Sequence, residues 1–329
     1  MKPKASFVVP LFVLILYGLL ISSRFLQTRI IEAGGNLYLS VIILQILIFL
    51  LPAIIFCRLK GVGYSVKLNV RLFSPLKFGA VLITAAVMIL ATILIRFLQI
   101  YVGQMTVFRF ALMNSYLGGD SGAEFLYTAM AFAVVPALTE EFVFRGILLT
   151  EYNEAGYRAA VATAISALLS SMMYFSLELL PIRLIAGFFL CLLTYATGSS
   201  LAAFLCHILF NIYGLFGEQY VLRALSDPTN RIIGLFSFLM LFLLVIVLFF
   251  GVYENIFRHM GQIGEPTPSY RLKKTDDGQT PDISATEADE EGTSRAALGE
   301  SARMGIEALF SPTFLLCILV FVVAIFGAL

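Results

Sequence analysis

Two adjacent carboxylates, Glu140 and Glu141, lie with Arg145 inside an apolar stretch of sequence, residues 124–149. A charged side chain at the mid-depth of a bilayer costs roughly 2.5–3.5 kcal/mol on insertion scales, so such groups usually face a helix-bundle interior or a wet cavity. Glu141 and Arg145 are spaced i, i+4 and are expected to pair on one helix face. Glu140 is rotated by about 100° from Glu141 and is expected to be left without that partner. This pattern suits a general base that activates water.

A second polar pair, His207 and Asn211, lies on a later apolar segment with the same i, i+4 spacing. Counting about 1.5 Å per residue from the nearest span end places Glu140 about 15 Å deep and His207 about 12 Å deep. The two segments run in opposite directions but reach the same level. We therefore expect the imidazole and the carboxamide to face the carboxylates, with Pro136 kinking the helix to open a pocket.

The composition indicates a polytopic membrane protein. The 329 residues are 60% hydrophobic and 13% charged, with a mean hydropathy of +0.93, whereas soluble domains average about 25% charged residues. A net charge of +1 gives no basic footprint for nucleic acid. The four cysteines have no CxxC or zinc-ribbon spacing and are expected to be small buried hydrophobes. They are Cys57, Cys191, Cys206 and Cys317.

Windows of about 20 apolar residues predict an all-α transmembrane helix bundle. Eight spans are expected in a core over residues 1–253, and one more in the C-terminal segment 309–329. The segment 254–308 holds just over half of the 21 acidic residues and is predicted to be a disordered cytoplasmic linker. The expected spans are residues 5–23, 37–57, 78–100, 124–149, 158–178, 182–196, 199–216, 231–252 and 309–328, with the sixth and seventh forming a tight hairpin through Thr197-Gly198-Ser199.

The basic residues predict the orientation. The loop 58–77 is the densest short cluster of Lys and Arg, so the positive-inside rule places it in the cytoplasm. Counting spans from this loop puts the N-terminus, the 150–157 loop and the polar linker on the same side. We expect a multi-pass protein of the cell membrane whose site opens toward the cytoplasm, because both motifs lie nearer that face.

The polar motifs resemble those of a known family. Residues 140–145 read Glu-Glu-Phe-Val-Phe-Arg, which resembles the EExxxR signature of the CAAX-processing protease and bacteriocin-immunity (CPBP) family of intramembrane proteases, which are like type II CAAX prenyl endopeptidases. Residues 207–211 resemble its HxxxN motif, and the run from Tyr195 to His207 resembles its YxxTGSLxxxxxxH lead-in. The resemblance covers about residues 120–216.

This resemblance implies a multi-helix membrane endopeptidase in which Glu140 activates water. It further implies that Glu141 with Arg145 orders the site, and that His207 with Asn211 orients the water, binds the developing oxyanion or donates a proton. The implied partners are a membrane-associated protein or peptide substrate and the lipid bilayer.

The chain departs from the family at its FxxxH motif, where Ser170 stands for the Phe and Tyr174 for the His. The sequence has only two histidines, so an intramembrane two-histidine metal site is excluded. Glu140 and His207 alone make a poor zinc shell, since catalytic zinc usually has three protein ligands. We expect no cofactor and a metal-free glutamate mechanism in which Tyr174 donates a hydrogen bond in place of the missing imidazole.

Two other functions stay open from the sequence. An inactive relative that serves as a membrane binding or bacteriocin-immunity scaffold would account for the missing histidine. A solute or proton transporter would use the carboxylate pair as a relay, but the outer halves of these two spans hold no acidic or basic residue except Glu124 at the edge.

Several other residues are given structural roles. Arg96 is expected to snorkel from a span end. Glu178 and Arg183 are expected to be solvated in a short outer loop. Met172 and Met173 are expected to fill the core, and for Tyr174 a packed aromatic is the alternative to a catalytic role.

Overall fold

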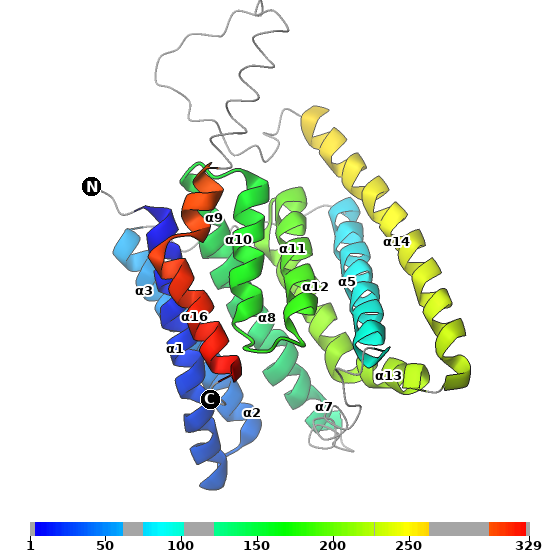
Figure 1. Cartoon of the computed structure of the whole chain (residues 1–329), viewed down its shortest axis with the longest axis horizontal. Helices are drawn as coiled ribbons and strands as arrows, with labels where there is room; N and C mark the ends of the chain where they lie inside the picture. Colours follow the sequence, from blue (N-terminus) through cyan, green and yellow to red (C-terminus); the bar gives the residue numbers. More distant parts are fainter. Residues whose placement is uncertain (1–3, 62–74, 102–121, 227, 263–302, 327–329) are drawn as a thin grey trace, which may run out of the picture.

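The computed structural model describes residues 4–61, 75–101, 122–226, 228–262 and 303–326, and these residues form helices and connecting turns with no strand among them. This confirms the predicted all-α helix bundle. Figure 1 shows most of the helices standing side by side along one common direction. Six helices are long and apolar enough to cross a membrane, and the bent pair Arg303–Leu309 and Pro312–Phe326 counts as a seventh if it forms one span.

The helices of the first part of the chain are α1 (Ala5–Glu32), α2 (Leu37–Gln45), α3 (Leu51–Lys60), α5 (Pro75–Tyr101), α7 (Gly122–Ala129), α8 (Val135–Glu141) and α9 (Leu149–Glu154). Those of the second part are α10 (Ala159–Met172), α11 (Leu180–Thr197), α12 (Ser200–Ile212), α13 (Glu218–Ser226), α14 (Pro228–Gln262) and α16 (Pro312–Phe326). Four π-helical segments join consecutive α-helices without a break: η1 (Ile46–Leu50), η2 (Met130–Val134), η3 (Phe142–Leu148) and η4 (Tyr213–Gly217).

Two of the nine expected spans do not meet the length and composition of a membrane-crossing helix. The span expected at 124–149 is the continuous helix from α7 to α9, which is not among the six. The span expected at 158–178 contains α10, which has only 14 residues. At 1.5 Å per residue α10 is about 21 Å long, shorter than a hydrocarbon core of about 30 Å. By length and composition alone, the described residues thus hold six candidate spans, or seven with the bent pair, within the all-α bundle.

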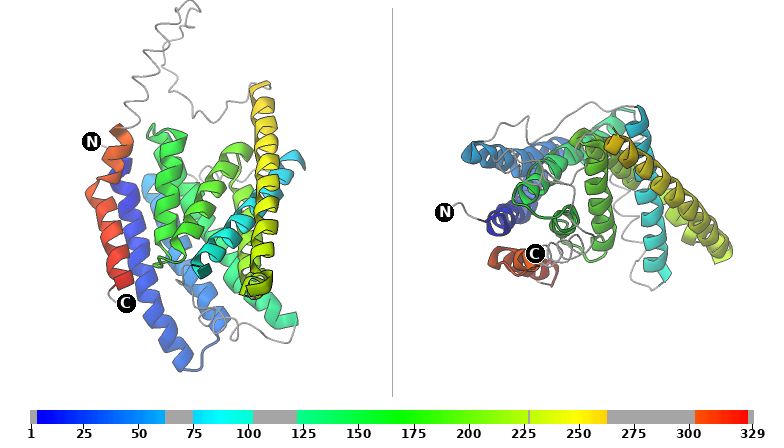
Figure 2. Two further views of the ribbon diagram at one scale, coloured as in Figure 1. Left: turned by 45° about the vertical axis from the view of Figure 1, so that its right-hand side comes forward. Right: turned by 90° about the horizontal axis from the view of Figure 1, so that it is seen from above.

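The C-terminal helix packs along the N-terminal one. Figure 2 shows α16 beside α1 in both views, and the Thr313 hydroxyl donates to the carbonyl of Phe7 at 3.1 Å. Lys4 forms an ion pair with Glu307 just before this contact. Helix α14 extends to residue 262, and residues 303–309 are helical, so both ends of the segment predicted as a linker are helical where the structure describes them. Residues 263–302 lie outside the described residues.

The hairpin between α11 and α12 is confirmed and has a clear local cause. Gly198 ends α11 with φ of +65°, a left-handed conformation that glycine adopts without a Cβ penalty. Ser199 then caps α12 by accepting a hydrogen bond from the Leu201 N–H at 3.2 Å. The turn reverses the chain within these residues, which sets α11 and α12 antiparallel.

Two buried apolar clusters hold the bundle together. One includes residues of α1, η1, η3, α10 and α16, and the other residues of α5, α11, α12 and α14. Segments α8 and η3 pack against α12, so the carboxylate motif lies where the two clusters meet. All four cysteines are free and buried, and Met172 and Met173 are buried in the core, as expected.

In Figure 1 the N-terminal end of α1, the α9–α10 turn and the C-terminal end of α14 lie toward the same end of the bundle. The sequence also places these three segments on one side of the membrane. The six apolar helices give the chain the make-up of a multi-pass membrane protein.

Candidate active site

The two carboxylates lie where one continuous helix changes from α to π hydrogen bonding. Glu140 and Glu141 are the last residues of α8, and Arg145 lies in the π segment η3. All three are buried, with at most 5% of each residue exposed. Pro136, expected to kink this helix, lies at the start of α8 directly after the π segment η2. π segments occur frequently at functional sites because they re-aim the side chains that follow.

Glu141 is fixed by two partners. Arg145 Nη1 donates to Glu141 Oε1 at 2.9 Å, which confirms the predicted pair, and Arg145 Nη2 donates to the carbonyl of Gly187 in α11 at 3.0 Å. The same Glu141 oxygen lies 2.7 Å from Nδ1 of His207 in α12. A proton on Nδ1 is donated to Glu141 in this geometry, which leaves Nε2 of the imidazole as an acceptor.

Glu140 is held by neutral donors. The Tyr174 hydroxyl donates to Oε2 at 2.9 Å, and the Gln45 carboxamide donates to Oε1 at 3.3 Å. His207 Nε2 lies 3.9 Å from Oε2, too far for a direct hydrogen bond but near enough for one water molecule to contact both atoms. Glu140 thus lacks a bond to Arg145, as predicted. It is nevertheless partnered, and no sequence pattern had pointed to Gln45 as a partner.

The position of Tyr174 depends on an unusual backbone turn. Phe175, the next residue, has φ of +47°, which costs an L-residue about 1–2 kcal/mol. Its ring is buried and packs edge-on against Tyr17 at 5.3 Å between centroids, which offsets that strain. This turn follows the end of α10 and places the Tyr174 hydroxyl within hydrogen-bonding distance of Glu140. Tyr174 therefore donates a hydrogen bond at the site, as expected for the residue that stands in place of the family histidine.

Arg183 is part of the site, so the expectation that it is solvated was wrong. Its guanidinium carbon lies 4.1 Å from the centre of the Tyr174 ring, and its Nη1 donates to Asn211 Oδ1 at 3.4 Å. The Asn211 amide in turn donates to the carbonyl of Ala133 in η2, also at 3.4 Å. In this structure Asn211 therefore holds Arg183 and ties α12 to η2. Its recorded bonds do not go to the carboxylates.

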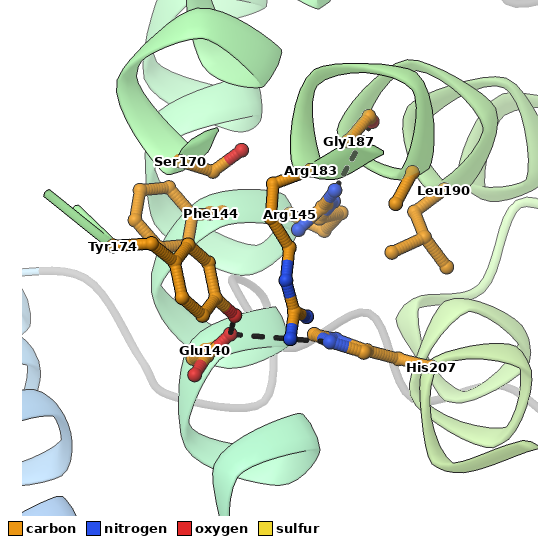
Figure 3. Close-up of a pocket in the computed structure, with 10 residues that line it drawn as sticks. Glu140, Phe144, Arg145, Ser170, Tyr174, Arg183, Gly187, Leu190 and His207 are labelled. Carbon is orange, nitrogen blue, oxygen red and sulfur yellow. Dashed lines mark hydrogen bonds and ion pairs between the residues drawn. The ribbon is translucent and has the colours of Figure 1, made fainter. Parts of the chain in front are cut away.

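A cavity of about 20 Å³ lies among these side chains. A cavity needs roughly 10–15 Å³ to hold one water molecule, so this one has room for a single water. Figure 3 shows Arg183 extending from α11 toward Glu140 and His207 at this cavity. The lining residues are Glu140, Phe144, Arg145, Ser170, Tyr174, Arg183, Ala186, Gly187, Leu190 and His207.

The donor set does not fit a catalytic metal. Among the residues that the structure describes, no group of three or more His, Cys, Asp and Glu side chains is arranged to hold a metal ion. Glu141 and His207 are bonded to each other, and catalytic zinc usually takes three protein ligands.

A second polar cluster, which we call the Arg96 cluster, consists of the buried Arg96, Gln99 and Glu218 and the partly exposed Glu178. Arg96 is only 5% exposed, so the expectation that it snorkels was wrong. It donates to Glu218 at 2.6 Å, to Glu178 at 2.9 Å and to Gln99 at 3.1 Å. Glu178 is thus ion-paired and not a freely solvated loop residue, which corrects a further expectation.

Comparison with protein families gives one match. Residues 122–213 match the family model described as type II CAAX prenyl endopeptidase Rce1-like. The matched region runs from α7 to the end of α12 and contains Glu140, Arg183 and His207, whereas Gln45 lies outside it. No curated protein and no solved structure matches the chain.

Proposed function

We propose that this chain, whose residues 122–213 form a domain of the Rce1-like family of type II CAAX prenyl endopeptidases, is an intramembrane endopeptidase. Its substrate is a membrane-associated protein or peptide, and the reaction is hydrolysis of a peptide bond by a water molecule that Glu140 activates. The observation that carries the proposal is the cavity of one-water size between Glu140 and His207.

The reaction balances with the groups at the cavity. Glu140 takes a proton from water while the water oxygen bonds to the scissile carbonyl carbon. The tetrahedral intermediate then collapses, the C–N bond breaks, and Glu140 returns the proton to the leaving amine. One water and one peptide bond are consumed, and a carboxylic acid and an amine are formed, which become a carboxylate and an ammonium group once the proton is exchanged.

The other side chains position these atoms. Tyr174 and Gln45 fix the two oxygens of Glu140, one each. Nε2 of His207 accepts a hydrogen bond from the attacking water, and Glu141 holds the imidazole in that tautomer. Arg145 in turn fixes Glu141 against α11.

The protein is proposed to lie in the cell membrane, with its cavity open toward the cytoplasm. The support is the basic loop 58–77, which the positive-inside rule assigns to the cytoplasm. An acidic and a basic residue in the protein interior also need access to water for turnover, and the site lies nearer to that end by helix count.

The test is Glu140→Gln in the full chain reconstituted in lipid nanodiscs. The probe is a pool of lipid-anchored, internally quenched peptides, and hydrolysis is followed by fluorescence and mass spectrometry. We expect the rate to fall by roughly 10³-fold or more with the melting temperature nearly unchanged, because glutamine fits the same space but accepts no proton. Glu154→Gln, an exposed carboxylate on the same continuous helix, is the matched control and should hydrolyse like the wild type.

Unchanged turnover in Glu140→Gln would falsify the mechanism. Binding of the peptides without hydrolysis by the wild type would instead favour the inactive binding scaffold. In that event Tyr174→His, which restores the family histidine, is the variant that decides whether the site lost activity through that substitution.

A further inference from the structure

We propose that Arg183 is a further catalytic residue, whose guanidinium stabilises the oxyanion that forms on the scissile carbonyl. This inference rests on the proposed hydrolysis and assigns a role to a side chain that the sequence patterns did not mark. It also replaces Asn211 as the direct donor to the oxyanion, since Asn211 does not line the cavity and its carboxamide accepts from Arg183 and donates to the backbone of η2.

The first support is position. Arg183 lines the same small cavity as Glu140 and His207, and Figure 3 shows its side chain reaching toward both. It arrives from α11, whereas Glu140 comes from α8 and His207 from α12. A substrate carbonyl that enters between these helices therefore meets the base on one helix and a cation on another.

The second support is the balance of charge. Glu141 and Arg145 compensate each other by direct contact at 2.9 Å. Glu140 receives hydrogen bonds from the neutral Tyr174 and Gln45. Arg183 is then the positive charge that remains beside the cavity. Its guanidinium carbon lies 4.1 Å from the centre of the Tyr174 ring, whose hydroxyl donates to Glu140.

The reaction moves negative charge toward Arg183. When Glu140 accepts the water proton it becomes neutral, and the negative charge appears on the carbonyl oxygen of the substrate. A fixed cation in a site that excludes most water stabilises that developing charge without reorganising. The same cation adds less to the ground state, because the substrate carbonyl is then uncharged, so the effect falls on kcat.

The third support is preorganisation. The guanidinium stacks on the Tyr174 ring at 4.1 Å and lies 5.7 Å from the centre of the Phe210 ring, while Asn211 accepts one of its N–H bonds. Arginine has five N–H donors in a rigid plane, so one bond to Asn211 leaves donors for a substrate oxygen. A lysine at this position has no planar group to stack on the Tyr174 ring, and its three N–H donors are not held in one fixed plane.

The kinetic test compares Arg183→Gln, Arg183→Lys and the control Arg24→Gln. Arg24 makes a similar ring contact, 5.5 Å from the centre of the neighbouring Phe175 ring, but does not line the cavity. We expect Arg183→Gln to lower kcat by roughly 10²–10³-fold with KM changed by less than about threefold, as for removal of one oxyanion donor. The kcat of Arg183→Lys should fall between those of Arg183→Gln and the wild type. The kcat of Arg24→Gln should match the wild type. A rise in KM with unchanged kcat, or no change in either, overturns the assignment.

A binding test covers the case in which no hydrolysis is detected. The probes are two pools of lipid-anchored peptides, one phosphinic and one ketomethylene, which carry an anionic tetrahedral and a neutral planar group in place of the scissile amide. Both are titrated into Glu140→Gln protein, where residue 140 is neutral as it is when the oxyanion has formed. We expect the phosphinic pool to bind more tightly than the ketomethylene pool. Adding Arg183→Gln should reduce the ratio of the two affinities roughly 10²-fold. Equal binding of the two pools, or a preference that survives Arg183→Gln, overturns the assignment independently of the proposed hydrolysis.

Discussion

The molecule buries two polar clusters built from the same residue types, and they are connected in different ways. In the Arg96 cluster the guanidinium contacts two carboxylates directly, at 2.6 and 2.9 Å. At the candidate active site the contacts of Glu140 within 3.5 Å come from a phenol and a carboxamide. The first arrangement cancels charge by contact, whereas the second leaves a carboxylate poised beside a cavity.

This contrast separates a cluster that stabilises the fold, around Arg96, from one that is arranged for chemistry, around Glu140. Arg96 on α5 joins Glu218 on α13 to Glu178 in the turn before α11, so that cluster connects three parts of the chain. Removing one partner from a buried ion pair leaves an uncompensated charge and is strongly destabilising. Replacing Glu140 by glutamine breaks no ion pair in direct contact, because the contacts of Glu140 within 3.5 Å come from Tyr174 and Gln45. Stability should therefore respond to one cluster and turnover to the other.

The largest expected effect tests whether the Arg96 cluster stabilises the fold. Arg96→Gln leaves the carboxylates of Glu178 and Glu218 without their guanidinium, and we expect a loss of about 3–5 kcal/mol of unfolding free energy. The measurement is reversible denaturation in detergent micelles, with hydrolysis scored per folded molecule. Arg29→Gln, which breaks an exposed ion pair, is the control and should change stability little. A stable Arg96→Gln protein with lost turnover would reverse the roles of the two clusters.

The next effect tests the chemical side. Tyr174→Phe removes the hydroxyl that donates to Glu140 Oε2 but keeps the ring on which Arg183 stacks. We expect kcat to fall by roughly 10–100-fold, because the base loses the donor that orients it, and the loss of one hydrogen bond to cost about 1–3 kcal/mol of stability. Steady-state kinetics with the quenched peptides provides the readout. Wild-type kcat in this variant would reduce Tyr174 to a packed aromatic.

The smallest expected effect sharpens the boundary of the site. Gln45→Met keeps the size of the side chain on α2 but removes the donor to Glu140 Oε1. This bond is the longer of the two to Glu140, at 3.3 Å, so we expect a fall in kcat of only about fivefold. Gln45 lies outside the matched region 122–213. A measurable loss would show that the N-terminal helices contribute to the site, and no loss would confine it to the matched domain.

Helical periodicity made part of this site predictable. The i, i+4 spacing fixed the Glu141–Arg145 pair because both residues lie on one continuous helix. Depth counting brought His207 level with Glu140, since helix rise is nearly constant. Gly198 and Ser199 marked the hairpin that sets α12 beside α11, because their roles depend on local backbone conformation.

The contacts of Gln45, Arg183 and Arg96 were not predictable from the sequence. Arg183 and Arg96 lie near the ends of apolar runs, where a polar side chain can reach solvent or fold back with equal ease. Gln45 lies inside the apolar run 37–57, and its own helix does not show which neighbour it faces. The choice depends on which helices stand opposite, and nothing in the local sequence encodes that arrangement. The expectation that Glu140 has no partner considered only residues on its own helix. Its partners Gln45 and Tyr174 come from other segments.

The sequence by itself determined an all-helical membrane bundle, the carboxylate motif and the depth of its histidine, because hydrophobic run length and helix geometry are local properties. The packing of the helices is what brings a glutamine from α2 and a tyrosine after α10 onto one carboxylate, with an arginine from α11 stacked on the ring of that tyrosine. That convergence depends on packing between helices far apart in the chain, where the cost of leaving a buried polar group unpaired selects one arrangement over its alternatives.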